Sequence, residues 1–320
     1  MRKKNIYIII FLFITFIFFN NTSLFTSFNA SKPLLLAHRG LAQTFDMAGI
    51  TNDTDTSKRI FPPEHQYLEN TRASMEAAFN LGADIVELDI QMTRDNKFAV
   101  FHDHTLAYRT NGTGAVKEHT MSELAALDIG YGYSADGGKT FPFRGKGAGL
   151  MPELDEVFKA FPQKNFLIHI KSNDTAEGEL LAGVLKSQPL ERLNGLRFYG
   201  GDRPMKALKE KMPEARVMSK ETLVNALLEY IACGWTGYVP KSCRGAWLHI
   251  PLKYAPLLWG WPYKFLSRMK SVDTQVVLVA GDGKFSEGFD SVEDLKKVPE
   301  NFPGYIWTNR IDKVAPQIKR

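Results

Sequence analysis

Short apolar runs alternate with longer amphipathic segments along most of the chain. Alternating side chains within short runs predict strands, and apolar residues three or four positions apart predict helices. The runs that predict strands are LLLAH (34–38), DIVELDI (84–90), KFAVFHD (97–103), NFLIHI (165–170), RLNGLRFYG (192–200), AWLHI (246–250), QVVLVAG (275–281) and GYIWT (304–308). Strands separated by helix-length segments predict a parallel sheet with helices outside it.

Helices are predicted between these runs. They are expected at 69–84, with an apolar stripe of Met75, Ala78 and Phe79, at 151–161, around 180–185, and at 223–231, with a stripe of Leu223, Leu227 and Ile231. About eight strands fit a closed (β/α)8 TIM barrel. An open doubly wound sheet is the alternative, but no glycine-rich phosphate loop follows the first strand.

Two segments break the alternation. Residues 43–63 are polar and contain a double proline, which predicts a long loop. Residues 105–150 are irregular, glycine-rich and aromatic, with one short helical stretch at 121–127. We therefore expect one barrel domain over residues 31–320, with a small inserted region at about 105–150, after the third strand.

Residues 1–30 differ from the rest of the chain. Arg2, Lys3 and Lys4 precede an apolar run over 6–19. A basic start and an apolar run of this length favour a secretory signal over a full membrane span. Cleavage after Ala30 fits poorly because Phe28 stands two places earlier, so an uncleaved anchor is the alternative. We expect export to the periplasm or the outside of the cell, or attachment to the membrane.

Composition and charge bear on the partners of the chain and on its disulfides. The chain has 320 residues, of which 44% are hydrophobic, and a net charge of +5 spread along it. No basic stripe indicates a nucleic-acid partner, and nothing indicates a protein partner. Cys233 and Cys243 are the two cysteines. They predict either one disulfide or two buried thiols.

Polar residues collect where the first four predicted strands end. His38 and Arg39 follow the first, Glu87 and Asp89 share one face of the second, and His102 with Asp103 ends the third. The fourth carries His169 and Lys171 on one face. Since active sites of parallel barrels lie at the carboxyl ends of the strands, we expect these side chains to share a pocket.

This residue set predicts phosphate chemistry. Two buried carboxylates repel each other, and a hard divalent cation such as Mg²⁺ or Ca²⁺ compensates them. His38 and His102 can act as general acid and base, while Arg39 and Lys171 offer positive charge to an anion. A buried salt-bridge network of Glu87 and Asp89 with the two cations is the structural alternative.

The sequence resembles the glycerophosphodiester phosphodiesterase family. The matching motifs are AHRG (37–40), LENT (68–71), the segment from Glu87 to Asp103, TLAYRTNGTGAV (105–116), MPELDEVF (151–158) and, more loosely, IWTNRID (306–312). The resemblance implies a TIM barrel that hydrolyses glycerophosphodiesters to glycerol 3-phosphate and an alcohol with the help of a divalent metal. In such enzymes the glycerol hydroxyl is thought to attack the phosphorus first, and water then opens the cyclic phosphate.

The resemblance also implies roles for individual residues. His38 and His102 would be the catalytic pair, Glu87 and Asp89 metal ligands, and Arg39 a phosphate contact. Glu69 and Asn70, at the start of a helix, and Asp103 would support the site. The inserted region would cover the site and influence the choice of substrate.

One strand departs from the family pattern. The family usually has Glu-x-Lys where this chain has His169-Ile170-Lys171. Three roles are open for His169: it coordinates the cation, it leaves that position to water, or it contacts the substrate phosphate. Direct coordination would shift the metal preference from Ca²⁺ or Mg²⁺ towards Mn²⁺, Co²⁺ or Zn²⁺.

Two other activities are compatible with the sequence. The same barrel could act as a phospholipase D- or C-like hydrolase of lysophospholipids, or as a binding protein that has lost catalysis. The aromatic and basic segment 254–270 would then be a candidate for contact with a membrane surface, with packing inside the barrel as the alternative.

Overall fold

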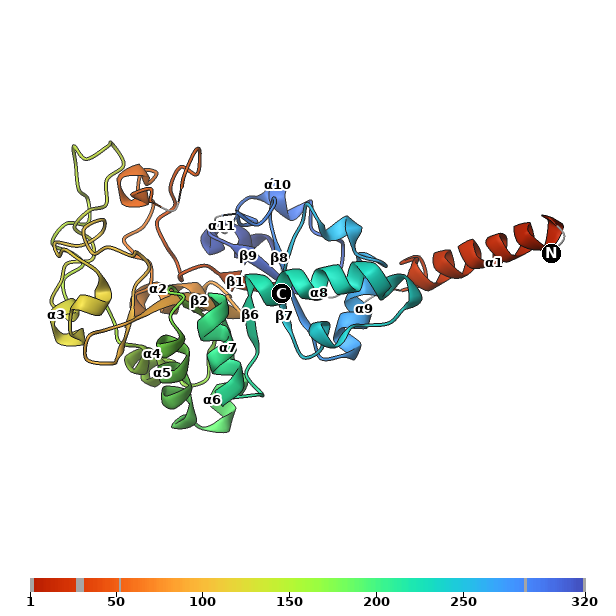
Figure 1. Ribbon diagram of the computed structural model, residues 1–320. Helices are drawn as coiled ribbons and strands as arrows, with labels where there is room; N and C mark the ends of the chain where they lie inside the picture. The colour runs from red at the N-terminus through yellow and green to blue at the C-terminus, as the bar shows by residue number, and fades with distance from the viewer. Residues whose placement is uncertain (1–2, 27–31, 52, 285–286, 319–320) are drawn as a thin grey trace. The chain divides into compact units, whose positions relative to one another are not determined.

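The computed structural model describes residues 3–26, 32–51, 53–284 and 287–318 (Figure 1). The chain divides into two compact units. The first unit comprises Leu35–Val217 and Thr308–Lys319, and the second comprises Met1–Leu34 and Met218–Trp307. The strands and helices belong to an α/β barrel of the (β/α)8 type, which is the predicted fold class.

In the first unit the sheet order is β6-β5-β4-β2-β1, with β3 beside β2. The elements up to the start of the second unit are β1 (Leu34–Ala37), α2 (Arg72–Asn80), β2 (Ile85–Met92), β3 (Phe98–Val100), α3 (Met121–Ala125), α4 (Leu154–Ala160), β4 (Asn165–Ile170), α5 (Thr175–Lys186), α6 (Leu190–Asn194), β5 (Leu196–Gly200), α7 (Asp202–Lys211) and β6 (Val217–Ser219), and α11 (Ile311–Val314) follows near the C-terminus.

The third predicted strand is not a barrel strand. β3 pairs antiparallel with β2, with Val100 opposite Ile90 and Phe98 opposite Met92. It forms a hairpin because Asn96, at φ +57°, lies in the tight turn between the two strands. The parallel strand that the prediction lacked is β6, whose three residues are too short to leave a clear alternation in the sequence.

Helix α2 begins with a capping box. The Thr71 side chain accepts a hydrogen bond from Ser74 N, and the Ser74 side chain accepts one from Thr71 N. Met75, Ala78 and Phe79 are buried, as predicted. The helix ends just before Gly82, whose φ of +103° suits a residue without a side chain. This start places Glu69 and Asn70 beside the ends of β1 and β2.

The irregular segment after β3 has its own hydrophobic cluster. Its buried members come from the insert, from β3 and from the long loop, and they include Ile60, Leu68, Phe101, Leu106, Leu124, Tyr133 and Phe143. The long loop is tied to the insert through Ser57, whose Oγ donates to Tyr108 O at 2.8 Å and whose carbonyl accepts from Ser134 N at 2.9 Å. Loop and insert therefore form one layer of the first unit.

The second unit contains strands in the order β9-β8-β7. Its elements are α1 (Lys3–Asn21), α8 (Lys220–Cys233), β7 (Trp247–Pro251), α9 (Tyr263–Ser271), β8 (Gln275–Val279), α10 (Val292–Leu295) and β9 (Tyr305–Thr308). The stripe predicted on α8 is wrong: the buried residues of this helix are Ala226 and Tyr230. Cys233 and Cys243 are free thiols, so the disulfide alternative is not realised.

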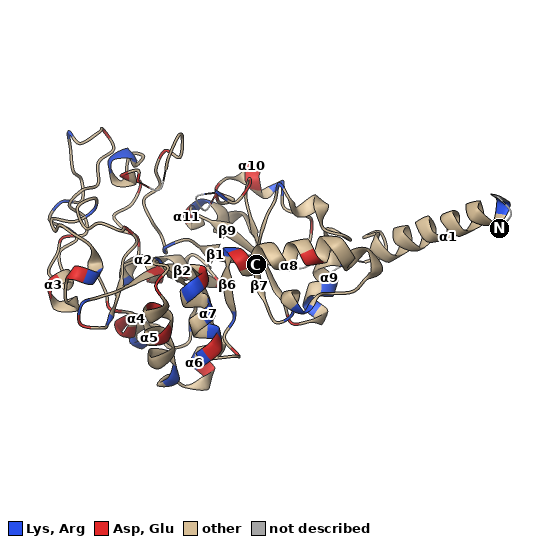
Figure 2. Ribbon diagram, in the orientation of Figure 1, with Lys and Arg blue, Asp and Glu red and all other residues tan. Residues whose placement is uncertain are grey.

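The apolar run near the N-terminus forms helix α1, which extends away from α8 and α9 of its unit (Figure 1). Residues Lys4–Asn21 are long and apolar enough to cross a membrane, and none of that stretch is buried in protein. Figure 2 shows no charged residue along α1 after its basic start. Phe28 and Ala30, which the cleavage prediction concerns, lie outside the described residues.

Candidate active site

All the site residues predicted from the sequence lie in the first unit and at one end of its strands. They are His38, Arg39, Glu69, Asn70, Glu87, Asp89, His102, Asp103, His169 and Lys171. Hydrogen bonds and ion pairs connect them into one network. Their individual roles depend on how this network is built.

Three neighbouring strands place a row of polar side chains side by side. Asp89 of β2 is paired with His169 of β4, and His169 with Tyr199 of β5. Glu87 precedes Asp89 by two residues and therefore points to the same side of the sheet. Both carboxylates are completely buried. Glu87 and Asp89 therefore share one face of the sheet, as predicted, and His169 lies on the same face.

The Asp89 carboxylate is held from several sides. Asn70 Nδ2 donates to its Oδ2 at 3.0 Å, and Asn70 Oδ1 accepts from Asp89 N at 3.1 Å. Arg39 Nε lies 3.2 Å from Oδ2, and Lys171 Nζ lies 3.7 Å from Oδ1. Burial alone would raise the pKa of Asp89, but the neighbouring positive charges hold it well below its usual range. Asp89 is therefore an ionised carboxylate.

Glu87 has the opposite electrostatic character. Arg39 N donates to its Oε2 at 3.1 Å, the Tyr199 hydroxyl donates to its Oε1 at 2.7 Å, and His38 Nε2 lies 3.8 Å from Oε2. Burial, and then the charge of Asp89, raise the pKa of Glu87 to about 8. Two buried carboxylates this close resist simultaneous ionisation unless a cation joins them.

Hydrogen bonds to both ring nitrogens determine the tautomer of His38. Nδ1 lies 2.6 Å from Asn309 Oδ1, while Nε2 accepts from Arg39 Nε at 3.1 Å. An amide oxygen accepts only, so Nδ1 carries the proton. Burial, and then the Arg39 charge, lower the pKa of His38 well below its usual value. His38 is a neutral imidazole whose Nε2 lone pair accepts from Arg39, at 3.8 Å from Glu87 Oε2.

His102 reaches the site because β3 runs back along β2. Phe101 N donates to Asp89 O at 3.0 Å, which places the next residue beside the buried carboxylates. His102 Nδ1 lies 2.7 Å from Asp103 Oδ1. Burial, followed by the charges of Arg39 and Lys171, lowers the pKa of His102 to about 4. The bond to Asp103 fixes the ring with Nε2 directed away from that carboxylate.

Arg39 lies in a tight turn after β1. Its φ is +57°, and that of Gly40 is +80°. A Cβ at Gly40 would lie 2.7 Å from Ser74 Oγ and 2.8 Å from the Ser74 carbonyl carbon, so this position requires glycine. The turn directs the Arg39 guanidinium back over the site, where Nη1 donates to Glu69 Oε1 at 3.0 Å.

The sequence analysis missed Arg109, the most heavily bonded cation of the site. Its side chain is 2% exposed and forms ion pairs with Asp103 and, at 3.4 Å, with Glu69 Oε2. Arg109 Nε also donates to the Tyr133 hydroxyl at 3.0 Å, and Nη2 donates to Thr56 Oγ1 at 2.9 Å. Arg109, in the insert, thus connects Thr56 of the long loop to Asp103 and Glu69, the carboxylates that bond His102 and Arg39.

Tyr199 and Asn309 were missed for a different reason. Tyr199 lies near the end of β5, and Asn309 directly follows β9. Extending the strand-end rule beyond the first four strands would have found both. Arg109 lies in the irregular insert, where periodicity gives no orientation; the sequence signal for it was its place in the family motif TLAYRTNGTGAV (105–116).

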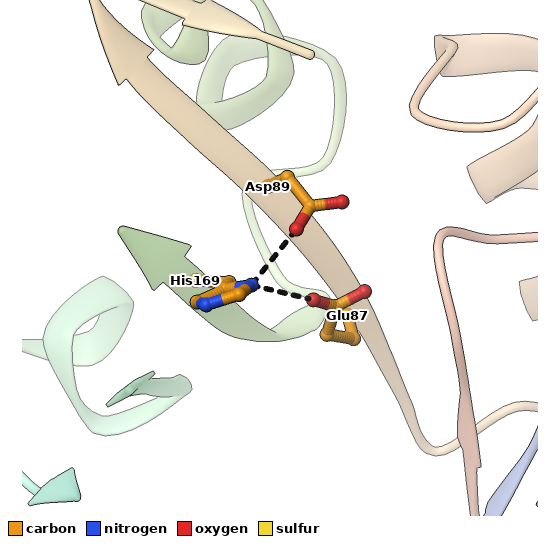
Figure 3. Close-up of side chains that lie close together, drawn as sticks. All are labelled: Glu87, Asp89 and His169. Atoms are coloured by element: carbon orange, nitrogen blue, oxygen red, sulfur yellow. Dashed lines mark hydrogen bonds and ion pairs between the residues drawn. The ribbon is translucent and has the colours of Figure 1, made fainter. Parts of the chain in front are cut away.

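Glu87, Asp89 and His169 have the geometry of a metal site. Each offers one ligand atom, and these atoms lie within 4.8 Å of one another. Figure 3 shows the imidazole turned towards both carboxylates, with His169 Nδ1 2.9 Å from Asp89 Oδ1 and 4.0 Å from Glu87 Oε1. Two carboxylates and one imidazole suit a divalent cation, so the donor set fits the cofactor that the resemblance implies.

The fold is an α/β barrel, and histidines and buried carboxylates lie together at the ends of its strands. A family model described as the glycerophosphoryl diester phosphodiesterase family matches residues 38–197, half of the 320-residue chain. The chain belongs to this family. The matched range contains all the predicted site residues.

Individual relatives agree with this assignment. The chain is 35% identical over 187 residues to a glycerophosphodiester phosphodiesterase of Caldanaerobacter subterraneus subsp. tengcongensis, covering 58% of this chain and 57% of that protein. It is 38% identical over 137 residues to one of Bacillus subtilis, covering 41% and 44%. The matches thus span about half the length of these curated relatives.

Solved structures support the fold over a longer stretch. A phosphodiesterase from Oleispira antarctica, solved with the product sn-glycerol-3-phosphate, aligns with a TM-score of 0.57 and 20% identity. The alignment covers 90% of this chain and 97% of that one. At this identity the likeness concerns the fold.

Proposed function

We propose that this chain is a metal-dependent glycerophosphodiester phosphodiesterase, which converts a glycerophosphodiester and water to glycerol 3-phosphate and an alcohol. The observation that carries the proposal is the pair of neutral imidazoles, His38 and His102, beside the buried Glu87 and Asp89 in a member of this family. A purely structural ion-pair network has no need of two histidines with lowered pKa values at the same strand ends.

Glu87, Asp89 and His169 would hold one divalent metal ion. When bound, the ion would supply positive charge to the phosphate oxygens. The imidazole favours Mn²⁺, Co²⁺ or Zn²⁺ over the Ca²⁺ or Mg²⁺ that an all-oxygen set would bind. Of the three roles considered for His169, coordination is supported by the direction of Nδ1 towards both carboxylates.

Arg39 and Lys171 would bind the substrate phosphate. Both are charged groups next to the carboxylates, and Arg39 is fixed in place by Glu69. Arg39 Nη1 is held by Glu69, while Nε, which bonds His38 in the free protein, would turn to the phosphate together with the remaining N–H groups. Lys171 Nζ, 3.7 Å from Asp89, would turn to a phosphate oxygen without leaving its partner.

The hydrogen bonds suggest how the two histidines divide the proton transfers. His38 donates Nδ1–H to the neutral amide of Asn309, so Nε2 is its basic atom. Nε2 would accept a proton from the attacking hydroxyl once Arg39 Nε, which bonds it in the free protein, turns to the substrate phosphate.

His102 is backed by the Asp103 carboxylate, which stabilises an imidazolium. His102 is neutral in the free protein, so it would first take up a solvent proton at Nε2 when the substrate phosphate offsets the charges of Arg39 and Lys171 that lower its pKa. It would then donate this proton to the departing alcohol oxygen as the bond from that oxygen to phosphorus breaks.

The proposal is tested with purified full-length protein stripped of metal. A panel of glycerophosphodiesters is assayed while Mn²⁺, Co²⁺, Zn²⁺, Mg²⁺ and Ca²⁺ are titrated separately, and glycerol 3-phosphate is measured as the product. We expect no turnover without metal and restoration at micromolar to millimolar cation. Full turnover in the metal-free protein would rule out a metal requirement. No turnover with any of the cations would rule out glycerophosphodiester hydrolysis.

A second candidate is hydrolysis of lysophospholipids. The observation that favours it is α1, which would bring the barrel to a lipid surface if it spans a membrane. Its basic start predicts that the barrel lies on the far side of the membrane from the cytoplasm. Comparing glycerophosphocholine with lysophosphatidylcholine separates the two substrates, because a lysophospholipid hydrolase would turn over the second faster.

A further inference from the structure

The last turn of α1 forms hydrogen bonds with other parts of the second unit. Asn20 Nδ2 and Asn21 Nδ2 both donate to Trp235 O, at 2.9 and 2.8 Å. The Phe13 ring packs edge-on against the Trp235 ring with centroids 5.6 Å apart. Polar contacts therefore begin where the apolar stretch of α1 ends.

Arg268 of α9 depends on α1 for part of its hydrogen bonding. This side chain is 8% exposed. Within the second unit its Nη1 donates to Tyr230 OH at 3.0 Å and to Gly234 O at 2.8 Å. From α1 it gains Asn21 Oδ1 at 3.0 Å, and its Nη2 donates to Asn20 O at 2.8 Å. Removing α1 would leave a mostly buried guanidinium with unsatisfied donors.

Ser23, just after α1, caps helix α9. The Pro262 at the N-cap of α9 makes no side-chain capping bond. Instead Ser23 Oγ accepts from Tyr263 N at 3.1 Å and from Lys264 N at 3.2 Å, and donates to Gly260 O at 2.9 Å. These are the first-turn N–H groups that every helix must satisfy from outside. A segment far away in the sequence fulfils this need.

We propose that α1 is a retained membrane anchor whose last turn is part of the folded second unit, and not a leader that is removed after export. If α1 were a removed leader, the mature domain would lose the hydrogen bonds that α1 and Ser23 make to Arg268 and to the start of α9. The partner of the exposed apolar stretch is the hydrocarbon of a lipid bilayer, because Lys4–Asn21 is long and apolar enough to cross one and none of it is buried in protein. Trp235 would lie near the membrane–water boundary, where tryptophan is favoured.

The first test is the size and location of the protein made in a bacterial host from the full sequence with a C-terminal tag. We expect it in the membrane pellet after alkaline carbonate washing, with an intact mass that includes residues 1–30. A tagged product that starts after Ala30, or that washes off the membrane, would overturn the proposal. This result does not depend on catalysis and is thus separate from the proposed activity.

The second test concerns the junction itself. Thermal unfolding in detergent is compared for the full chain, Asn21→Ala, Arg268→Ala and the double variant. We expect Asn21→Ala to lower Tm by about 2–6 °C and the double variant to lose less than the sum of the single losses. The matched control is Asn5→Ala, an exposed residue at the other end of α1, which should leave Tm unchanged. Additive losses, or an unchanged Tm for Asn21→Ala, would show that the last turn of α1 is not part of the fold.

Discussion

His169 Nδ1 lies 2.9 Å from Asp89 Oδ1, and its ring is stacked on Tyr199 at a centroid distance of 4.0 Å. The tyrosine hydroxyl in turn donates to Glu87 Oε1. His169 stands where the family usually has a glutamate. Its ring contacts the carboxylates through Nδ1 and the Tyr199 ring through its face. This arrangement fixes the ring with Nδ1 facing the two carboxylates.

Replacing His169 with glutamate tests whether it coordinates the metal. His169→Glu restores the family pattern, so we expect activity to be kept and dependence on Ca²⁺ or Mg²⁺ to strengthen, because a carboxylate prefers harder cations. The measurement is activity against concentration for each cation. Unchanged metal preference and affinity would mean that His169 does not bind the ion.

Tyr199 should support the metal site without binding the metal. Tyr199→Phe keeps the ring against His169 but removes the hydroxyl from Glu87. Loss of a hydrogen bond to a ligating carboxylate typically weakens metal binding about 10- to 100-fold. We expect this loss in the cation titration, with kcat at saturating metal reduced less. An unchanged cation titration would show that the bond from Tyr199 to Glu87 does not support metal binding.

Arg109 should be needed for both stability and turnover. Arg109→Met leaves Asp103 and Glu69 buried without their shared cation. Breaking one partner of a buried ion pair costs about 3–5 kcal/mol. We expect the free energy of unfolding to fall by that order, as measured by urea denaturation.

Turnover should fall together with stability in Arg109→Met, because Asp103 and Glu69, which orient His102 and Arg39, lose the cation that holds them in place. Arg144→Met is the control: Arg144 lies in the same insert but is exposed, with its guanidinium over the Tyr131 and Phe141 rings. This variant should differ little from the parent in either measurement. Equal effects of the two substitutions would contradict a special role for Arg109.

The proposed division of proton transfers predicts a dependence on the leaving group. If His102 protonates the departing alcohol, His102→Ala should slow glycerophosphocholine hydrolysis about 10²- to 10⁴-fold. A p-nitrophenyl ester of glycerol phosphate has a leaving group that needs no proton, so its hydrolysis should suffer far less. His38→Ala should slow both substrates. Equal losses on both substrates for His102→Ala would assign the acid role elsewhere.

The strand-end rule predicted from the sequence most of the residues that the structure brings together in the candidate site. It works because parallel strands align their carboxyl ends, so Glu87, Asp89, His169 and Lys171 are brought together by backbone register alone. The same rule placed His102 in the site through an incorrect strand direction. β3 is antiparallel, and His102 reaches the site because the chain turns back between Met92 and Phe98, a direction that apolar alternation does not reveal.

The parts that the sequence left undetermined depend on tertiary contacts. Arg109 acquires its role only when the insert folds over Asp103 and Glu69, and no periodic pattern encodes that contact. The junction between α1 and Arg268 joins residues more than two hundred positions apart. Composition showed that α1 is apolar, but only the folded unit shows what its last turn contacts.

The proposed function requires that His38 and His102 catalyse hydrolysis of a glycerophosphodiester. The most direct measurement is glycerol 3-phosphate release from glycerophosphocholine by the metal-loaded full-length protein and by its His38→Ala and His102→Ala variants, with folding checked by thermal unfolding. We expect turnover by the parent and a loss of at least about 100-fold in each folded variant. A parent without turnover, or variants as active as the parent, would contradict the account.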